Sequence, residues 1–344
     1  MREKIISALK SLVFLAIGLG LVWWFVKDLE EEEITQIKNA FSQANYAWLF
    51  FAGLIGIISH VSRSARWQIL LEPLGHKPGF ANTFYALMVG YLANIAFPRL
   101  GEISRCALLN KYEKIPVHQS IGTVFVDRIM DLITLALLLI ILVVTQFDLL
   151  FKFTNERLFR PILKKLIAVV PEGYGIVVSI LSVIITVMIF FWLTRRFRNS
   201  SLVQKIKLLV REFVKGFLTI KDLDRPYMFV FHSISIWLMY YLSIYVAFQC
   251  MDVTSNLGPG VALSILVFGT FAFILVQGGL GAYPIAVMEV MLLYGVTATL
   301  GFAFGWIVWV AQTVFVLILG VSSLVLLPLS NKNKNNASLS ATQV

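Results

Sequence analysis

Long apolar stretches separated by short polar connections run through most of this sequence. A helix needs about 20 mostly apolar residues to cross the hydrocarbon core of a bilayer. Several stretches have the composition and approximate length expected of such helices. They are residues 8–26, 46–62, 118–146, 174–194, 228–250 and 301–328. The pattern predicts an all-α protein, a polytopic transmembrane helical bundle with about six full spans.

Two further apolar stretches are interrupted by glycine and proline. Residues 80–97 lead into a break at 97–102, and residues 261–276 lead into a break at 277–284. A second short helix follows each break. We expect each unit to be a broken-helix hairpin that enters and leaves the bilayer on one face. In the simplest alternative both stretches cross fully, which gives about eight plain spans.

The composition agrees with a lipid environment. Hydrophobic residues make up 58% of the chain and charged residues 14%, whereas soluble domains carry about 25% charged residues. A single transmembrane domain is therefore predicted over residues 1–328, followed by a polar, disordered tail at 329–344. The formal net charge is +10. No soluble basic domain presents that charge, so nucleic acid is not an expected partner.

The distribution of Lys and Arg predicts the orientation, because cytoplasmic connections carry an excess of both. Basic residues precede the first predicted span, recur in the connection at 195–215 and follow the last span at 332–334. The connection at 28–33 is acidic, and the one at 251–260 has no basic residue. We therefore expect a multi-pass protein of the cell inner membrane with both termini in the cytoplasm.

The order of spans and hairpins predicts an inverted repeat. Residues 1–146 read as two spans, a hairpin and a span that start inside, and residues 174–328 read as the same series starting outside. Many secondary transporters have this architecture, and their broken helices meet near the midplane to form the substrate site. The two breaks are therefore the first places to search for function.

The first break carries charged residues. Arg99 lies within it, Glu102 follows at the start of the next half-helix, and Arg105 lies one turn further on. A half-helix N-terminus suits an anion, and a guanidinium offers a forked donor to phosphate. We expect these residues to bind substrate, with Glu102 either orienting Arg99 or capping its own helix. The alternative is a structural turn with an internal ion pair.

The second break has no charge and three expected substrate-binding glycines, Gly278, Gly279 and Gly281. Glycine permits a positive φ or a close approach of the backbone. Pro284 fits the first turn of the helix that follows. The break is either a groove lined by backbone groups or a plain tight turn.

Two other groups of charges lie in or beside predicted spans. Asp127, Arg128 and Asp131 precede a long apolar run, and Arg128 can pair with Asp131 at i+3. They are expected to form a coupling or charge relay, since intramembrane ionisable residues are costly, or else a compensated cluster that fixes helix packing. Arg63 and Arg66 could bind anionic headgroups, or could anchor the helix end together with Trp67 as an interfacial residue.

Enzyme and cofactor signals are scarce. The sequence has no HExxH, GxSxG or P-loop motif, and its four histidines have no metal-ligand spacing. We therefore predict no enzyme activity, no metal and no cofactor.

The charged and glycine-rich motifs together resemble one family, the lysylphosphatidylglycerol synthase transmembrane-region family, also called flippase-like proteins. The resemblance covers roughly residues 5–328. It implies a membrane protein that moves or handles lipids with charged headgroups. The second glycine motif departs from the form of many members, because Gln277 precedes the glycines and Pro284 follows them. The motifs are Arg63-x-x-Arg66-Trp67, Asn94 to Arg105, Asp127-Arg128 with Asp131, and Gly278-Gly279-Leu280-Gly281.

Two-domain members of this family attach an aminoacyl group through a soluble C-terminal domain. Such a domain is not expected after residue 328, so synthase activity is not implied. The leading interpretation is a flippase-like transporter of an anionic lipid, such as a phospholipid, glycolipid or polyprenyl phosphate. A second is a non-transporting membrane partner of a lipid synthase or glycosyltransferase. A third is an intramembrane transferase that uses Glu102 or the aspartates.

Overall fold

The computed structural model describes residues 18–97, 100–148 and 223–341, together with the single positions 16, 151, 160 and 188. These residues form helices and turns, without a strand among them, which confirms the all-α prediction. The chain divides into two compact units, residues 1–142 with 220–344, and residues 143–219. Few residues of the second unit are described, and the elements given below belong to the first.

Among the described residues, four helical segments are long and apolar enough to cross a membrane, which confirms a polytopic helical membrane protein. They correspond to four of the predicted spans. The predicted span at 174–194 lies outside the described residues except for Met188, and the span at 8–26 is described only in part. The four segments are Tyr46–Leu74, Val117–Thr145, Pro226–Cys250 and Ala298–Lys332.

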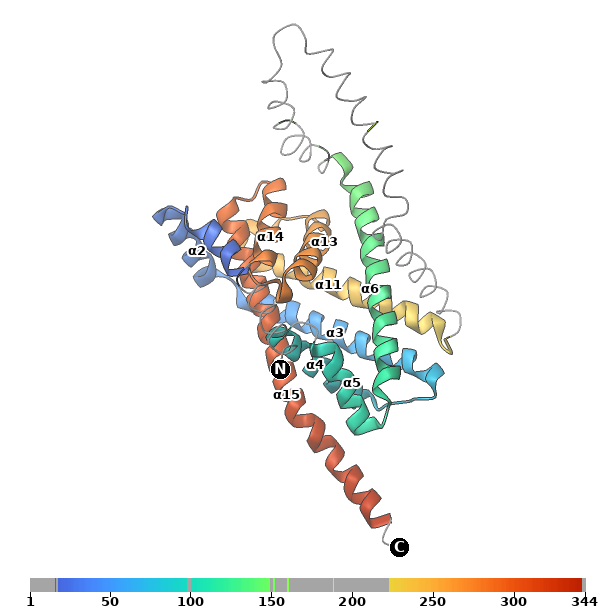
Figure 1. Ribbon diagram of the computed structural model, residues 1–344. Helices are drawn as coiled ribbons and strands as arrows, with labels where there is room; N and C mark the ends of the chain where they lie inside the picture. The colour runs from blue at the N-terminus through green and yellow to red at the C-terminus, as the bar shows by residue number, and fades with distance from the viewer. Residues whose placement is uncertain are drawn as a thin grey trace, which may run out of the picture. The chain divides into compact units, whose positions relative to one another are not determined.

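The main helices of the first unit are shown in Figure 1. In chain order the elements are α2 (Glu31–Gln43), α3 (Tyr46–Leu71), η1 (Glu72–Leu74), α4 (Phe80–Ala96), α5 (Leu100–Glu113), α6 (Val117–Thr145), α11 (Pro226–Ala247), η4 (Phe248–Cys250), α12 (Asp252–Ser255), α13 (Pro259–Leu275), η5 (Gln277–Gly279), α14 (Ala282–Leu293) and α15 (Ala298–Ala341).

Helices α3 and α11, far apart in the sequence, pack side by side (Figure 1). Each begins at a residue suited to a helix start. The side chain of Asn45 accepts a hydrogen bond from the backbone N–H of Ala47 at 3.1 Å, and Pro226 opens α11. Ser243 on α11 donates to the carbonyl oxygen of Ala52 on α3 at 2.8 Å. Small polar residues thus link two otherwise apolar helices, as is typical of membrane bundles.

The first predicted break separates α4 from α5, and the two helices pack against each other. A Cβ atom added at Gly101 would lie 2.1 Å from the carbonyl oxygen of Gly90, so the two backbones are in contact. Asn94 near the end of α4 accepts a hydrogen bond from the Gly101 N–H at 2.8 Å. This bond satisfies one of the free donors at the start of α5.

The second predicted break separates α13 from α14, and these helices also pack together. Gly278, Gly279 and Gly281 have φ values of +66°, +67° and +71°. Residues other than glycine rarely adopt this left-handed backbone conformation. The predicted use of glycine for a positive φ at this break is therefore confirmed. Trp309 on α15 donates to the carbonyl oxygen of Gly278 at 2.7 Å, which ties the break to the bundle.

Helix α15 packs against α14, α2, α4 and α3. Glycines mark its closest contacts, because a Cβ at Gly305 would lie 2.7 Å from the Cα of Pro284, and a Cβ at Gly320 would lie 2.7 Å from Leu92. The helix continues to Ala341, through most of the tail that the sequence predicts to be disordered. Extending an existing helix costs far less than nucleating one, so a polar sequence can continue it.

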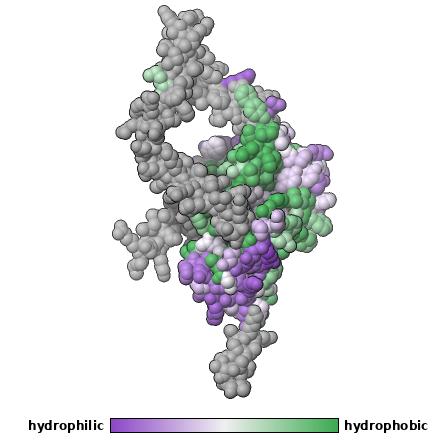
Figure 2. All heavy atoms as spheres, turned by 90° about the vertical axis from the view of Figure 1, so that its right-hand side faces the viewer, coloured by the Kyte–Doolittle hydropathy of each residue, from purple (hydrophilic) through white to green (hydrophobic). Residues whose placement is uncertain are grey.

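Residues of α3, α4, α5 and α6 form a small apolar core. Figure 2 shows that hydrophilic surface gathers at one end of the face it displays, with hydrophobic surface above it. The polar end agrees with charged residues in the connections at 72–79 and 111–116. The core residues are Trp67, Leu71, Ala86, Cys106, Leu109, Ile115 and Val124.

The close approach of α14 and α15 gives a test of the packing. Gly305→Ala should destabilise the protein by about 1–3 kcal/mol, because the added methyl group meets the backbone of Pro284. Thermal unfolding of the purified protein in detergent measures the effect.

Gly56→Ala is the matched control. A Cβ at Gly56, in the middle of α3, would meet nothing within 4 Å, so the higher helix propensity of alanine should leave stability equal or slightly raised. Equal melting temperatures for the two variants would contradict the contact between α14 and α15.

Candidate functional site

Two arginines on α3 are buried inside the protein. Arg63 is 4% exposed and Arg66 is fully buried. Trp67 is also fully buried, and its indole N–H donates to the Thr123 hydroxyl on α6 at 2.9 Å. The expectation that these residues anchor the helix end at the membrane interface is therefore wrong. Neighbouring helices cover the end of α3, so its arginines face protein.

The partners of these arginines are Asp127 and Asp131 on α6. Arg66 Nη2 lies 2.5 Å from Asp127 Oδ1 and 2.7 Å from Asp131 Oδ1, and its Nε lies 2.9 Å from Asp127 Oδ1. Arg63 Nη1 lies 2.5 Å from Asp131 Oδ2 and 3.6 Å from Asp127 Oδ2. The i, i+4 spacing places both carboxylates on the face of α6 that meets α3. We call these four residues the tetrad.

Helix α11 supports the tetrad from a third side. The Ser233 hydroxyl accepts a hydrogen bond from Arg66 Nη1 at 3.3 Å and donates to the carbonyl oxygen of Phe229 at 2.8 Å. The guanidinium of Arg66 also lies 5.9 Å from the centre of the Phe229 ring, within range of a cation–π interaction. Sequence reasoning did not find Ser233, because nothing local distinguishes it from other serines in apolar helices.

A second group of charges adjoins the tetrad. Arg128 Nη2 lies 2.9 Å from Glu102 Oε1, and Arg128 Nη1 lies 3.6 Å from Asp131 Oδ2. The predicted i, i+3 pair on α6 is thus confirmed. Glu102 thus has an ion-pair partner on α6. Arg99 lies outside the described residues, so the role of Glu102 in orienting Arg99 stays a prediction.

Arg105 on α5 completes the site. Its guanidinium lies 4.7 Å from the centre of the Trp67 ring, and its Nη2 lies 3.8 Å from Asp127 Oδ2. Sequence reasoning placed Arg105 near the first break but did not find its contact with Trp67. Residues 67 and 105 lie on different helices, so only the fold brings them together.

Charge is not balanced among the described side chains of this site. Four arginines face three carboxylates, which leaves one positive charge in excess. An isolated charge at membrane depth is costly, and a buried pair that loses one partner is destabilised by about 3–5 kcal/mol. The tetrad is neutral and the pair of Arg128 with Glu102 is neutral, so the excess charge is that of Arg105. The members are Arg63, Arg66, Arg105, Arg128, Glu102, Asp127 and Asp131.

The glycines of the second break have other neighbours. Gly278 is bonded to Trp309, Gly279 faces Phe273, and Gly281 meets the backbone of Gly18 in the first helix. The turn η5 packs against α4, the helix that leads into the first break. The two breaks thus share α4 as a neighbour, while the charged residues gather at the first.

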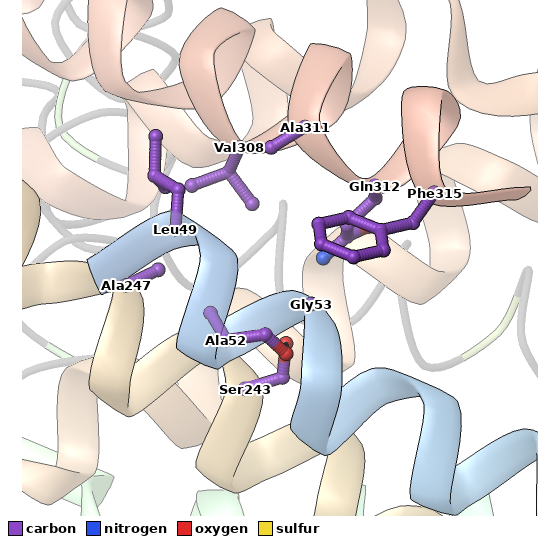
Figure 3. A pocket seen from close by; sticks show the side chains of 9 residues that line it. All are labelled: Leu49, Ala52, Gly53, Ser243, Ala247, Val308, Ala311, Gln312 and Phe315. Carbon is purple, nitrogen blue, oxygen red and sulfur yellow. Dashed lines mark hydrogen bonds between the residues drawn. The ribbon is translucent and has the colours of Figure 1, made fainter. Parts of the chain in front are cut away.

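A small cavity lies between α3, α11 and α15, with room for about one water molecule. Figure 3 shows Gln312 and Phe315 of α15 beside Gly53 of α3. Gly53 is about ten residues before Arg63, or about 15 Å along the helix. No titratable residue lines this cavity, so we assign no chemistry to it. Its lining residues are Leu49, Ala52, Gly53, Ser243, Ala247, Val308, Ala311, Gln312 and Phe315.

A separate ion pair joins the end of α3 to the start of α11. Arg225 Nε donates to Glu72 Oε2 at 3.1 Å, and the side chain of Arg225 is 55% exposed. The hydrogen bond to Glu72 raises the pKa of the Arg225 guanidinium above its ordinary value. This pair is outside the charged site and serves as a reference for it. Across the described part of the chain, no group of three His, Cys, Asp or Glu residues could hold a metal ion.

Comparisons with known proteins place the chain among membrane proteins. A membrane protein of the UPF0104 group from Methanocaldococcus jannaschii is 30% identical over 101 residues, which are 28% of this chain and 30% of that protein. No solved structure matches the chain. The family model described as the lysylphosphatidylglycerol synthase TM region matches residues 11–320. Because that match covers nearly the whole chain, the protein belongs to the lysylphosphatidylglycerol synthase TM region family.

Proposed function

We propose that this protein is a flippase-like transporter that moves an anionic lipid across the cell inner membrane. The observation that carries the proposal is the excess positive charge of the buried site, in helices that are otherwise apolar. A transporter of anionic headgroups needs a positive charge at membrane depth. A purely structural cluster would be more stable if its charges balanced.

The two broken helices support the same function. Helix α5 has 14 residues and α14 has 12, so they measure about 21 and 18 Å, short of the roughly 30 Å hydrocarbon core. These lengths favour hairpins over full spans. An inverted repeat of spans and hairpins is the architecture in which half-helices form a substrate site. The charged site lies beside the first break, where such a repeat would place it.

The family supports lipid as the substrate. Its name refers to the membrane region of an enzyme that acts on a phospholipid, and the charged residues of the motifs that carry the resemblance, such as Arg66, Glu102 and Asp127, meet in the charged site. Partnership with a lipid synthase or glycosyltransferase stays the alternative function. Transport and partnership differ in one observable, because a partner does not move lipid by itself.

Reconstitution into liposomes tests transport. The protein should move a fluorescent phosphatidylglycerol between leaflets faster than protein-free liposomes do, and faster than it moves the matching phosphatidylcholine. Arg128→Gln should slow this movement by about tenfold or more, since a charge-assisted hydrogen bond contributes about 1.5–3 kcal/mol. Quenching of the outer leaflet by dithionite gives the rate.

Arg225→Gln is the matched control. Both arginines are partly exposed and each pairs with a glutamate, but Arg225 lies outside the site, so its variant should keep the wild-type rate. Wild-type protein that elutes as a folded species and moves no more lipid than empty liposomes would rule out autonomous transport. Stoichiometric copurification of a synthase would then favour the partner role.

The proposed topology has its own test. In a Cys-free background, Glu31→Cys and Asn256→Cys should react with an impermeant thiol reagent on spheroplasts, and Lys77→Cys should be protected. The reason is the predicted orientation, with acidic or uncharged connections outside and basic ones inside.

A cysteine at the first break separates a hairpin from two full crossings. Phe97→Cys should resist the reagent if the break lies within the bilayer. Full crossings would place residue 97 on the outer surface, so labelling at the rate of Glu31→Cys would contradict the hairpin.

A further inference from the structure

Arg105 has an unusual environment for a buried arginine. It is 2% exposed, and none of its three side-chain nitrogens has a hydrogen-bond partner among the described residues. Its distance of 3.8 Å from Asp127 Oδ2 is too long for a hydrogen bond. A guanidinium carries five N–H donors, and burying donors without acceptors is costly. The arrangement is that of a site whose acceptor is a ligand.

Arg105 lines a recess between α4 and α5. Its walls include Gly90, Tyr91, Gly101, Glu102 and Arg128. The first turn of α5 forms one wall, and a helix N-terminus favours an anion through its dipole. The Gly101 N–H of that turn is bonded to Asn94, so the feature that points to a ligand is the buried Arg105 guanidinium, which lies over Trp67 but has no hydrogen-bond acceptor among the described residues.

Glu102 and Arg128 close this recess. Their ion pair is 2.9 Å long, and the side chains are 30% and 40% exposed, in contrast to the buried tetrad. Partly exposed pairs contribute little to stability, so this one can open at small cost. The recess has no room for a water molecule as it stands, and separating the pair would both widen it and free the guanidinium of Arg128.

We propose that the recess binds the phosphate group of a lipid, with Arg105 and Arg128 as its ligands and Glu102 as the counter-ion that the phosphate displaces. The proposal rests on the proposed function and names the chemical group that the site takes. The oxygens of one phosphate bridge two guanidinium groups, each with its own fork of donors. In the absence of lipid, Glu102 occupies Arg128 and keeps the recess shut.

Binding to the purified protein in detergent tests this assignment by calorimetry. The probes are dioctanoyl phosphatidylglycerol, dioctanoylglycerol, which lacks the phosphate, and inorganic phosphate. The phosphate lipid should bind and dioctanoylglycerol should not. Inorganic phosphate that binds as tightly as the lipid would identify free phosphate as the source of the ligand and overturn the lipid assignment.

The variants separate binding from packing. Arg105→Lys keeps the charge but loses the fork, so it should weaken binding of the phosphate lipid by about tenfold or more. Glu102→Gln removes the competing carboxylate, so it should tighten binding several-fold. A purely structural role for Glu102 gives no reason for tighter binding. Arg225→Lys, a change of the same kind outside the site, should bind as the wild type does.

The outcomes are distinct from those of the transport test. Wild-type affinity in a folded Arg105→Lys variant overturns the proposal even if lipid transport is intact. If Arg105→Lys does not fold, Glu102→Gln decides, and unchanged or weaker binding overturns the proposal. The predicted pattern of affinities in a protein that moves no lipid would support the phosphate site and reject transport.

Discussion

Salt bridges between guanidinium and carboxylate groups connect α3 to α6, and the rest of the site depends on them. Arg63 and Arg66 are buried against Asp127 and Asp131, where neither sign of charge could remain alone at acceptable cost. The tetrad fixes the rotation of α6 relative to α3. That rotation in turn places Arg128 beside Glu102 on α5. The partly exposed ion pair of Arg128 and Glu102 thus owes its position to the buried tetrad.

Glycine contacts position the helices around this network. Gly90 and Gly101 let the backbones of α4 and α5 touch beside the recess, and Gly305 lets α15 approach α14. Lipid offers no hydrophobic drive for helices to associate, so close van der Waals contact at small residues is a main source of packing energy. The same contacts hold the short helices of both breaks, whose free backbone groups need protein or ordered partners.

The sequence predicted features that depend on local spacing. The apolar runs predicted the four spans found among the described residues. The two breaks lie where the sequence predicts them, and Arg128 pairs with Asp131 as the i+3 spacing indicates. The positive φ of Gly278 also follows from local chemistry. The sequence did not predict the burial of Arg66 and Trp67. Basic and aromatic residues at the end of a span are typical of the membrane interface, which suggested an interfacial position for both. Their partners are some 60 residues away in the sequence, and periodicity carries no information on such pairs.

The energetic coupling between Arg66 and Asp127 is the most direct test of whether the buried charges of the tetrad compensate one another. The free energy of unfolding can be measured in detergent for Arg66→Gln, for Asp127→Asn and for the double variant. Each single change leaves the buried tetrad with one uncompensated charge, so each should destabilise the protein strongly, while the double variant should be more stable than the sum of the two predicts. A coupling energy of about 1–3 kcal/mol is expected. Strictly additive effects would contradict a network that depends on mutual compensation of buried charges.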